Sequence, residues 1–151
     1  MKRLLLAAAM SAAAVCASAQ AQDYGLNPTY GTVNLSAGFM PDPYRVDVVS
    51  GGNIDASWIQ GCVGMISDAP DVRLNYSAGG YELFLNVASD YDTTLVVNGP
   101  DGQWYCDDDS GGGLTPGLAF YPAMSGQYDI WIGSYNGQFE NAELQISEVR
   151  N

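Results

Sequence analysis

Apolar and polar residues alternate in short segments along most of the chain, and turn-forming residues separate these segments. In the clearest segment, 81–88, Tyr81, Leu83, Leu85 and Val87 share one face, because successive side chains of a strand point to opposite sides. The segment 128–134 repeats this pattern near the end of the chain. Ten segments are predicted as strands: 30–36, 44–50, 62–67, 71–76, 81–88, 93–98, 103–106, 117–121, 128–134 and 143–147.

Turn sequences fall between these segments. Ser50-Gly51-Gly52-Asn53 follows one segment, and Gly99-Pro100-Asp101-Gly102 joins two others in a pattern typical of a hairpin. No stretch after the N-terminal region has helical periodicity with caps. About eight to ten short strands with frequent turns predict an all-β domain at 30–151, either a sandwich or a barrel.

The N-terminal region has the order of a secretory signal peptide. Lys2 and Arg3 precede an apolar run, and Ala17-Ser18-Ala19 supplies the small residues of a cleavage site. We expect a signal peptide at 1–19, with cleavage after Ala21 as the alternative, and a polar linker at 20–29. The apolar run is shorter than the roughly 20 residues that span a bilayer, so membrane insertion is not expected. The protein is predicted to be periplasmic or extracellular.

The expected mature chain is strongly acidic. It has three arginines against 17 carboxylates, a net charge of −14, and neither lysine nor histidine. Such a surface repels nucleic acid and anionic lipid, and it favours solubility and divalent cations. Cys62 and Cys106 remain after cleavage, and in an oxidising compartment they predict one disulfide, with two buried thiols as the alternative.

The order of several motifs resembles a known family. Asp92-Thr93-Thr94-Leu95, the turn at 99–102, the acidic run 106–109 and the segment 125–135, which begins Ser125-Gly126-Gln127-Tyr128, are similar to the bacterial pre-peptidase C-terminal domain. The resemblance covers about the last 60 residues. It implies a single jelly-roll-like antiparallel sandwich in a secreted protein, a domain often attached to proteases, with some members binding calcium or a polymer such as collagen. No attached protease domain is found in this sequence.

The acidic run is followed by serine and three glycines, which together form the sharpest candidate site. Asp107, Asp108 and Asp109 stand on a loop whose glycines let carbonyl oxygens turn inward, and calcium prefers six to eight oxygen ligands. The family motif adds Asp92 to this set, and Asp90 is a weaker candidate. The prediction is calcium as cofactor. The alternative is a solvated acidic loop.

Catalysis is not expected. Proteases of the serine–histidine type need a base that titrates near neutral pH, and a serine–lysine pair needs a lysine, whereas the mature chain has neither residue. A pair of carboxylates in a hydrolase is the one enzymatic alternative left open.

Aromatic residues are numerous, with three tryptophans and ten tyrosines. Trp131 alternates with Ile130 and Ile132 and is expected on the outer face of its strand, while Trp104 and Tyr105 lie beside the acidic run. These three residues form a candidate binding face for sugars, with core packing as the alternative. The sequence thus predicts a non-catalytic binding module for a polymer, glycan or protein, with a lectin-like sugar module as the main alternative.

Overall fold

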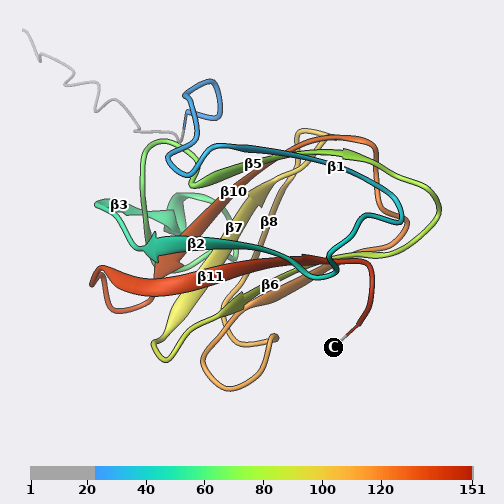
Figure 1. The fold of residues 1–151 in the computed structure, drawn as a ribbon. Coiled ribbons are helices and arrows are strands. Elements are labelled where there is room, and N and C mark those ends of the chain that lie inside the picture. The colour runs from blue at the N-terminus through green and yellow to red at the C-terminus, as the bar shows by residue number, and fades with distance from the viewer. Residues whose placement is uncertain (1–22, 151) are drawn as a thin grey trace, which may run out of the picture.

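Residues 23–150 are described by a computed structural model, in which two β-sheets pack face to face. The fold is an all-β sandwich, as predicted, and Figure 1 shows β1, β5 and β10 in one layer and β2, β11 and β6 in the other. The seven-stranded sheet contains β1 (Thr32–Ser36), β3 (Ile54–Asp55), β4 (Met65–Ile66), β5 (Val72–Ser77), β7 (Thr93–Asn98), β8 (Trp104–Asp107) and β10 (Gly126–Ser134). The four-stranded sheet contains β2 (Tyr44–Ser50), β6 (Leu83–Ala88), β9 (Gly117–Phe120) and β11 (Glu140–Ser147).

The long strand β10 organises the larger sheet. Along one edge it pairs first with β5 and then, at Ser134, with β4, while its other edge pairs with β7, which pairs in turn with β8. The smaller sheet has the order β2-β11-β6-β9 and is antiparallel throughout. The pairing of β1 with β5 is parallel, a departure from the purely antiparallel sandwich that was predicted.

The main core lies between the two sheets and follows the alternation seen in the sequence. Leu83, Leu85 and Val87 of β6 face Leu95 and other inward residues of the larger sheet, and all of them are buried. Burying an aliphatic side chain of this size contributes about 1.5–3 kcal/mol relative to leaving it in water. Tyr81 does not share this face, because it precedes β6 in a turn and is 55% exposed.

A second apolar cluster lies on the outer face of the larger sheet. The segment 54–66, which carries β3, a short 3-10 helix (Ala56–Trp58) and β4, covers Val96 and Trp131 with Ala56, Ile59 and Ile66. Trp131 does point away from the core between the sheets, but this segment leaves it 0% exposed. The prediction that Trp131 belongs to an exposed aromatic face is therefore wrong, because a distant part of the chain covers the strand.

Most predicted strands are present, two of them with the predicted bounds. β2 and β7 begin and end where the sequence pattern places them, whereas β10 and β11 begin earlier than expected. Of the predicted strand 62–67, only Met65–Ile66 is a strand in the structure. Cys62 instead lies in the irregular part of the covering segment that precedes it. β3 was not predicted.

The N-terminal part that the structure describes is fastened to the sandwich. Residues 23–29 were predicted as linker, yet the N–H of Thr29 donates to the carbonyl of Pro70 at 2.8 Å, and Arg73 donates to two carbonyls of the same segment. The predicted signal peptide, 1–19, lies outside the described residues, as do 20–22. Within 23–150, no helix is long and apolar enough to cross a membrane.

Candidate functional site

A cleft of about 730 Å³ opens on the outer face of the four-stranded sheet. Strands β6, β9 and β11 form its floor, and the loops 88–91 and 110–115 and the C-terminal segment form its walls. Its lining residues are Phe84, Asn86, Val87, Ala88, Ser89, Asp90, Tyr91, Ser110, Gly111, Gly112, Gly113, Leu114, Thr115, Gly117, Leu118, Ala119, Gln145 and Arg150.

Small residues of β9 line the floor of this cleft. In the register of β6 and β9, Phe84 lies opposite Ala119 and Asn86 lies opposite Gly117. A side chain at position 117 would be crowded, because its Cβ would lie 2.6 Å from Oδ1 of Asn86, which would have to move, and 3.1 Å from Cα of Gly111. Glycine at 117 therefore allows the glycine-rich loop to fold back against the start of β9.

Asp107 holds that loop in place. Its carboxylate accepts hydrogen bonds from the N–H of Ser110 at 2.8 Å, from Oγ of Ser110 at 2.6 Å and from the N–H of Gly117 at 2.9 Å. The N–H of Gly111 donates to the carbonyl of Thr115 at 2.9 Å, which closes the loop on itself. One side chain thus fixes both ends of the wall of the cleft.

Polar groups cross the sheet in a row beside the cleft. Arg45 lies opposite Gln145, and Gln145 lies opposite Asn86. Glu143 accepts a hydrogen bond from the Gln145 amide at 2.8 Å and forms an ion pair with Arg45. At the C-terminal wall, the guanidinium of Arg150 lies over the ring of Phe84, 5.5 Å from its centroid.

The residues predicted to bind calcium lie near this loop but do not converge on one point. Burial raises the pKa of the Asp92 carboxyl, and the negative charges of Asp109 and Asp108 raise it further, so these three side chains repel one another. Asp107 is engaged in the hydrogen bonds of the loop, and Asp90 lines the cleft. Within residues 23–150, no three His, Cys, Asp or Glu side chains are grouped so that they could hold a metal ion. The calcium site stays a prediction.

The predicted disulfide is confirmed. Cys62 and Cys106 are bonded, with their Cα atoms 5.5 Å apart, in the usual range. The bond joins the covering segment to β8, one residue before Asp107. It therefore links the second apolar cluster to the loop that walls the cleft.

The two other residues of the predicted aromatic face are partly buried. The Trp104 ring packs between Trp58 and Trp131, each with its centroid 5.4 Å away, and it meets Trp58 edge to face. Tyr105 packs against Phe120, and its hydroxyl donates to Asp101 at 2.7 Å. These rings do not share one plane, so they do not form a flat stacking platform.

One carboxyl has a strongly raised pKa but does not line the cleft. Burial raises the pKa of Asp71 to about 7, although the N–H of Ile132 donates to its carboxylate at 2.7 Å. Asp71 is only 3% exposed and is not among the residues that line the cleft. Its position at the start of β5, where β10 changes partner, gives it a structural role.

Sequence reasoning found the loop 107–113 but missed the floor and far wall of the cleft. Phe84, Asn86, Gln145 and Arg150 come from strands and a terminus that are distant along the chain, and only the sheet register brings them together. No short motif marks such a set. The small residues facing outward from β9, Gly117 and Ala119, are the one signal in the sequence that a hollow lies there.

Comparison with known proteins gives similar folds only. No family model matches the sequence, and no curated protein sequence matches it. The crystal structure of the pre-peptidase C-terminal domain of a collagenase from Bacillus anthracis matches at 12% identity with a TM-score of 0.48, covering 81% of this chain and 100% of that one. PliG, a periplasmic inhibitor of g-type lysozyme from Aeromonas hydrophila, matches at 13% identity with a TM-score of 0.37, covering 77% and 96%. Both likenesses concern the fold alone.

Proposed function

We propose that the protein is a non-catalytic binding module of the periplasm or cell exterior, and that its ligand occupies the cleft on the four-stranded sheet. The observation that carries this proposal is the hollow itself. About 730 Å³ lies between two loops on this sheet face, with the small side chain of Ala119 on its floor. Concave sites with a few convergent polar groups are the usual places for ligands.

The absence of suitable acid–base groups supports a binding role. The sequence contains no histidine, and its one lysine is Lys2. The carboxyl whose pKa lies near neutrality, Asp71, is buried and does not line the cleft. Proton transfer by a side chain requires contact with the reacting group, which Asp71 does not offer.

The lining of the cleft suits an extended protein segment. Tyr91 and Leu114, 48% and 56% exposed, offer apolar surface on two walls. Gly111, Gly112 and Gly113 are exposed on the loop wall, where the N–H groups of Gly111 and Gly112 already donate within the loop, and Asn86 and Gln145 add neutral amides on the floor. Exposed peptide groups bind the main chain of a ligand, and apolar walls hold its side chains.

A panel of random peptides displayed on phage tests this proposal. Peptides enriched on the mature protein are expected to lose binding to Ala119→Trp, which fills the floor, and to keep it with Gln103→Trp, an exposed position on the β7–β8 hairpin. Amide chemical shifts of the wild type should move at Asn86 and Gly117 when a peptide is added. Peptides that bind Ala119→Trp as well as the wild type, or a failure to enrich any peptide, would overturn the proposal.

Calcium is a second component of the proposal, and one observation favours it. Asp92, Asp108 and Asp109 repel one another beside the loop that walls the cleft, and a divalent cation would relieve that repulsion. Calcium that binds only the folded protein raises the melting midpoint. The mature protein is expected to melt higher in millimolar calcium than in chelator, and Asp92→Asn should reduce the shift. An equal midpoint in both conditions would remove calcium from the proposal.

A further inference from the structure

The outer face of the seven-stranded sheet contains a second hollow, of about 520 Å³, that the proposed function does not use. It lies where β1, β5 and β10 run side by side, on the opposite side of the sandwich from the cleft. The side chains along it are all uncharged, and besides the buried Tyr76 they include three carboxamides and three serine hydroxyls: Asn34, Asn75, Gln127, Ser36, Ser77 and Ser125.

The three carboxamides stand directly opposite one another. Asn34 of β1 pairs in register with Asn75 of β5, and Asn75 pairs in register with Gln127 of β10. Since neighbouring strands lie about 4.8 Å apart, the three side chains form a row across the sheet at that spacing. We call Asn34, Asn75 and Gln127 the amide row, and all three residues are exposed.

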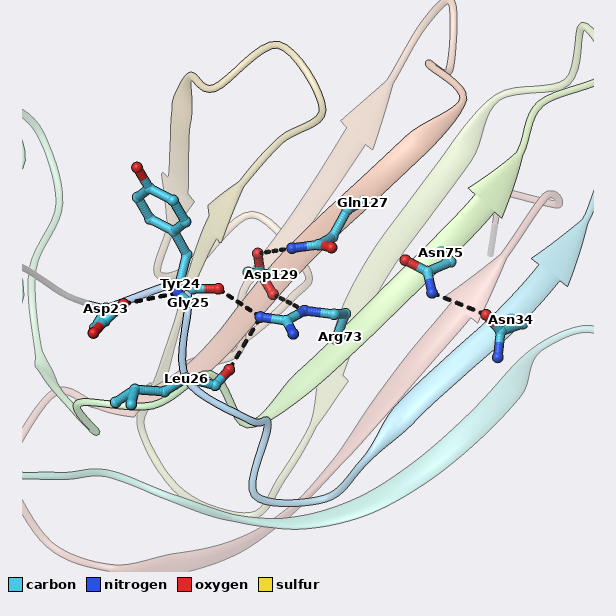
Figure 2. A network of polar contacts seen from close by, with 9 residues as sticks. All are labelled: Asp23, Tyr24, Gly25, Leu26, Asn34, Arg73, Asn75, Gln127 and Asp129. Carbon is cyan, nitrogen blue, oxygen red and sulfur yellow. Dashed lines mark hydrogen bonds and ion pairs between the residues drawn. The ribbon is translucent and has the colours of Figure 1, made fainter.

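Neighbouring groups hold the amide row in a fixed orientation (Figure 2). Nδ2 of Asn75 donates to Oδ1 of Asn34 at 2.9 Å, and Nε2 of Gln127 donates to Oδ2 of Asp129 at 2.7 Å. Asp129 is held in turn by Nε of Arg73 at 2.7 Å. Groups ordered in this way lose little conformational entropy when a ligand binds.

Charge sets this surface apart from the rest of the protein. The sequence has 17 carboxylates, yet none of the residues that line this hollow is acidic. The Asp129 carboxylate, which Gln127 contacts, is paired with Arg73 and almost fully buried. Arg73 also donates to the carbonyls of Tyr24 and Leu26, so the N-terminal segment covers the charged end of the row. A neutral polar surface on an acidic protein complements a neutral ligand, since it avoids the cost of burying an unpaired charge.

We propose that the amide row is a binding site for a neutral polysaccharide. Each carboxamide offers both a donor and an acceptor, and a sugar hydroxyl is also both, so adjacent hydroxyls of a chain exchange paired hydrogen bonds with the row. The regular spacing of the amides across three neighbouring strands suits a repeating chain rather than a single small molecule. The site is independent of the cleft on the other sheet.

Affinity electrophoresis in gels that contain hydroxyethyl cellulose, dextran or laminarin tests the site. The mature protein is expected to be retarded by at least one of these neutral polymers, and less by polygalacturonate, which is anionic. The double variant Asn75→Ala/Gln127→Ala should bind about tenfold more weakly, because it removes two of the three amides. Asn53→Ala, an exposed amide in the β2–β3 loop, is the matched control and should bind as the wild type does.

Two results would overturn the proposal: no retardation by any of the three neutral polymers, or full retardation of the double variant with its melting midpoint unchanged. If the double variant proves unstable, Asn75→Asp serves in its place, because it keeps the shape and adds a charge that should weaken binding. Ala119→Trp separates the two sites. Retardation by a neutral polymer should persist in that variant, whether or not the cleft binds peptides.

Discussion

Asp107 and Gly117 are joined by a hydrogen bond of 2.9 Å between the carboxylate Oδ2 and the backbone nitrogen, across the loop that walls the cleft. The same carboxylate holds Ser110 near the start of the loop. Asp107, which the sequence predicts as a calcium ligand, thus stabilises the conformation of the loop. The shape of the cleft depends on it.

Replacing Asp107 with alanine should therefore loosen the loop and lower the free energy of unfolding. Three hydrogen bonds to a partly exposed carboxylate are lost, and we expect a decrease of about 1–2 kcal/mol in urea unfolding. Asp109→Ala is the matched control, because it removes a charge of the same loop, one that raises the pKa of Asp92, and leaves the three hydrogen bonds of Asp107 in place. An equal loss in both variants would mean that general loop charge, not the anchoring bonds, sets the stability.

Removing the disulfide should destabilise the protein and expose Trp131. Cys62 and Cys106 are 44 residues apart, and closing a loop of that length stabilises the folded state by about 4 kcal/mol in the chain-entropy model. In Cys62→Ala/Cys106→Ala we expect a loss of about 2–4 kcal/mol and a shift of tryptophan emission to longer wavelength, because the covering segment is no longer tied down. Val63→Ala, an exposed change in the same segment, should leave both unchanged. Unshifted emission would contradict the role assigned to the disulfide.

Asp71 should make stability depend on pH in a direction opposite to most carboxylates. Burial raises its pKa from the ordinary 3.8 to about 7, so between these values the folded state holds a proton that the unfolded chain has released. The free energy of unfolding attributable to Asp71 therefore falls as the pH rises from about 4 to 7 and levels off above 7.

Asp71→Asn tests this dependence, because asparagine still accepts the hydrogen bond from Ile132 but carries no charge. The variant is expected to be more stable than the wild type at pH 8, with an upper limit on the order of 4 kcal/mol, and the gain should shrink near pH 4. Urea unfolding at both pH values measures the difference, from which groups that titrate alike in both proteins cancel. A gain that is the same at both values would show that Asp71 is ionised throughout.

The sequence pattern was sufficient to place most strands because each depends on local alternation and turns. β2 and β7 match their predicted bounds, since Ser50-Gly51-Gly52 and Gly99-Pro100 end them sharply. β3 has two residues, too few to show any alternation. The burial of Trp131 was not predictable from its own strand, because residues 54–66 decide it.

Most residues of both candidate sites could not be predicted from the sequence, for a related reason. The amide row joins residues 34, 75 and 127, and the floor of the cleft joins 86, 117 and 145. Each set is defined by the register between strands that are far apart in the sequence, and a shift of one residue in any strand would turn its side chains to the other face. Local periodicity shows which side chains of a strand face the core, but it does not show which strands lie next to it.

Arg73 and Asp129 offer a test of the buried charge beneath the amide row. The Asp129 side chain is 3% exposed and its carboxylate is paired with Arg73, so Arg73→Met leaves a buried charge that keeps its hydrogen bond from Gln127 but has lost its ion pair. We expect a loss of about 3 kcal/mol in the free energy of unfolding. The double variant Arg73→Met/Asp129→Asn should recover part of this loss, since the amide no longer carries the charge, although it contains one more substitution. Urea unfolding measures the free energy of unfolding of both variants. A double variant less stable than Arg73→Met would show that the buried Asp129 charge is not the cause of the lost stability.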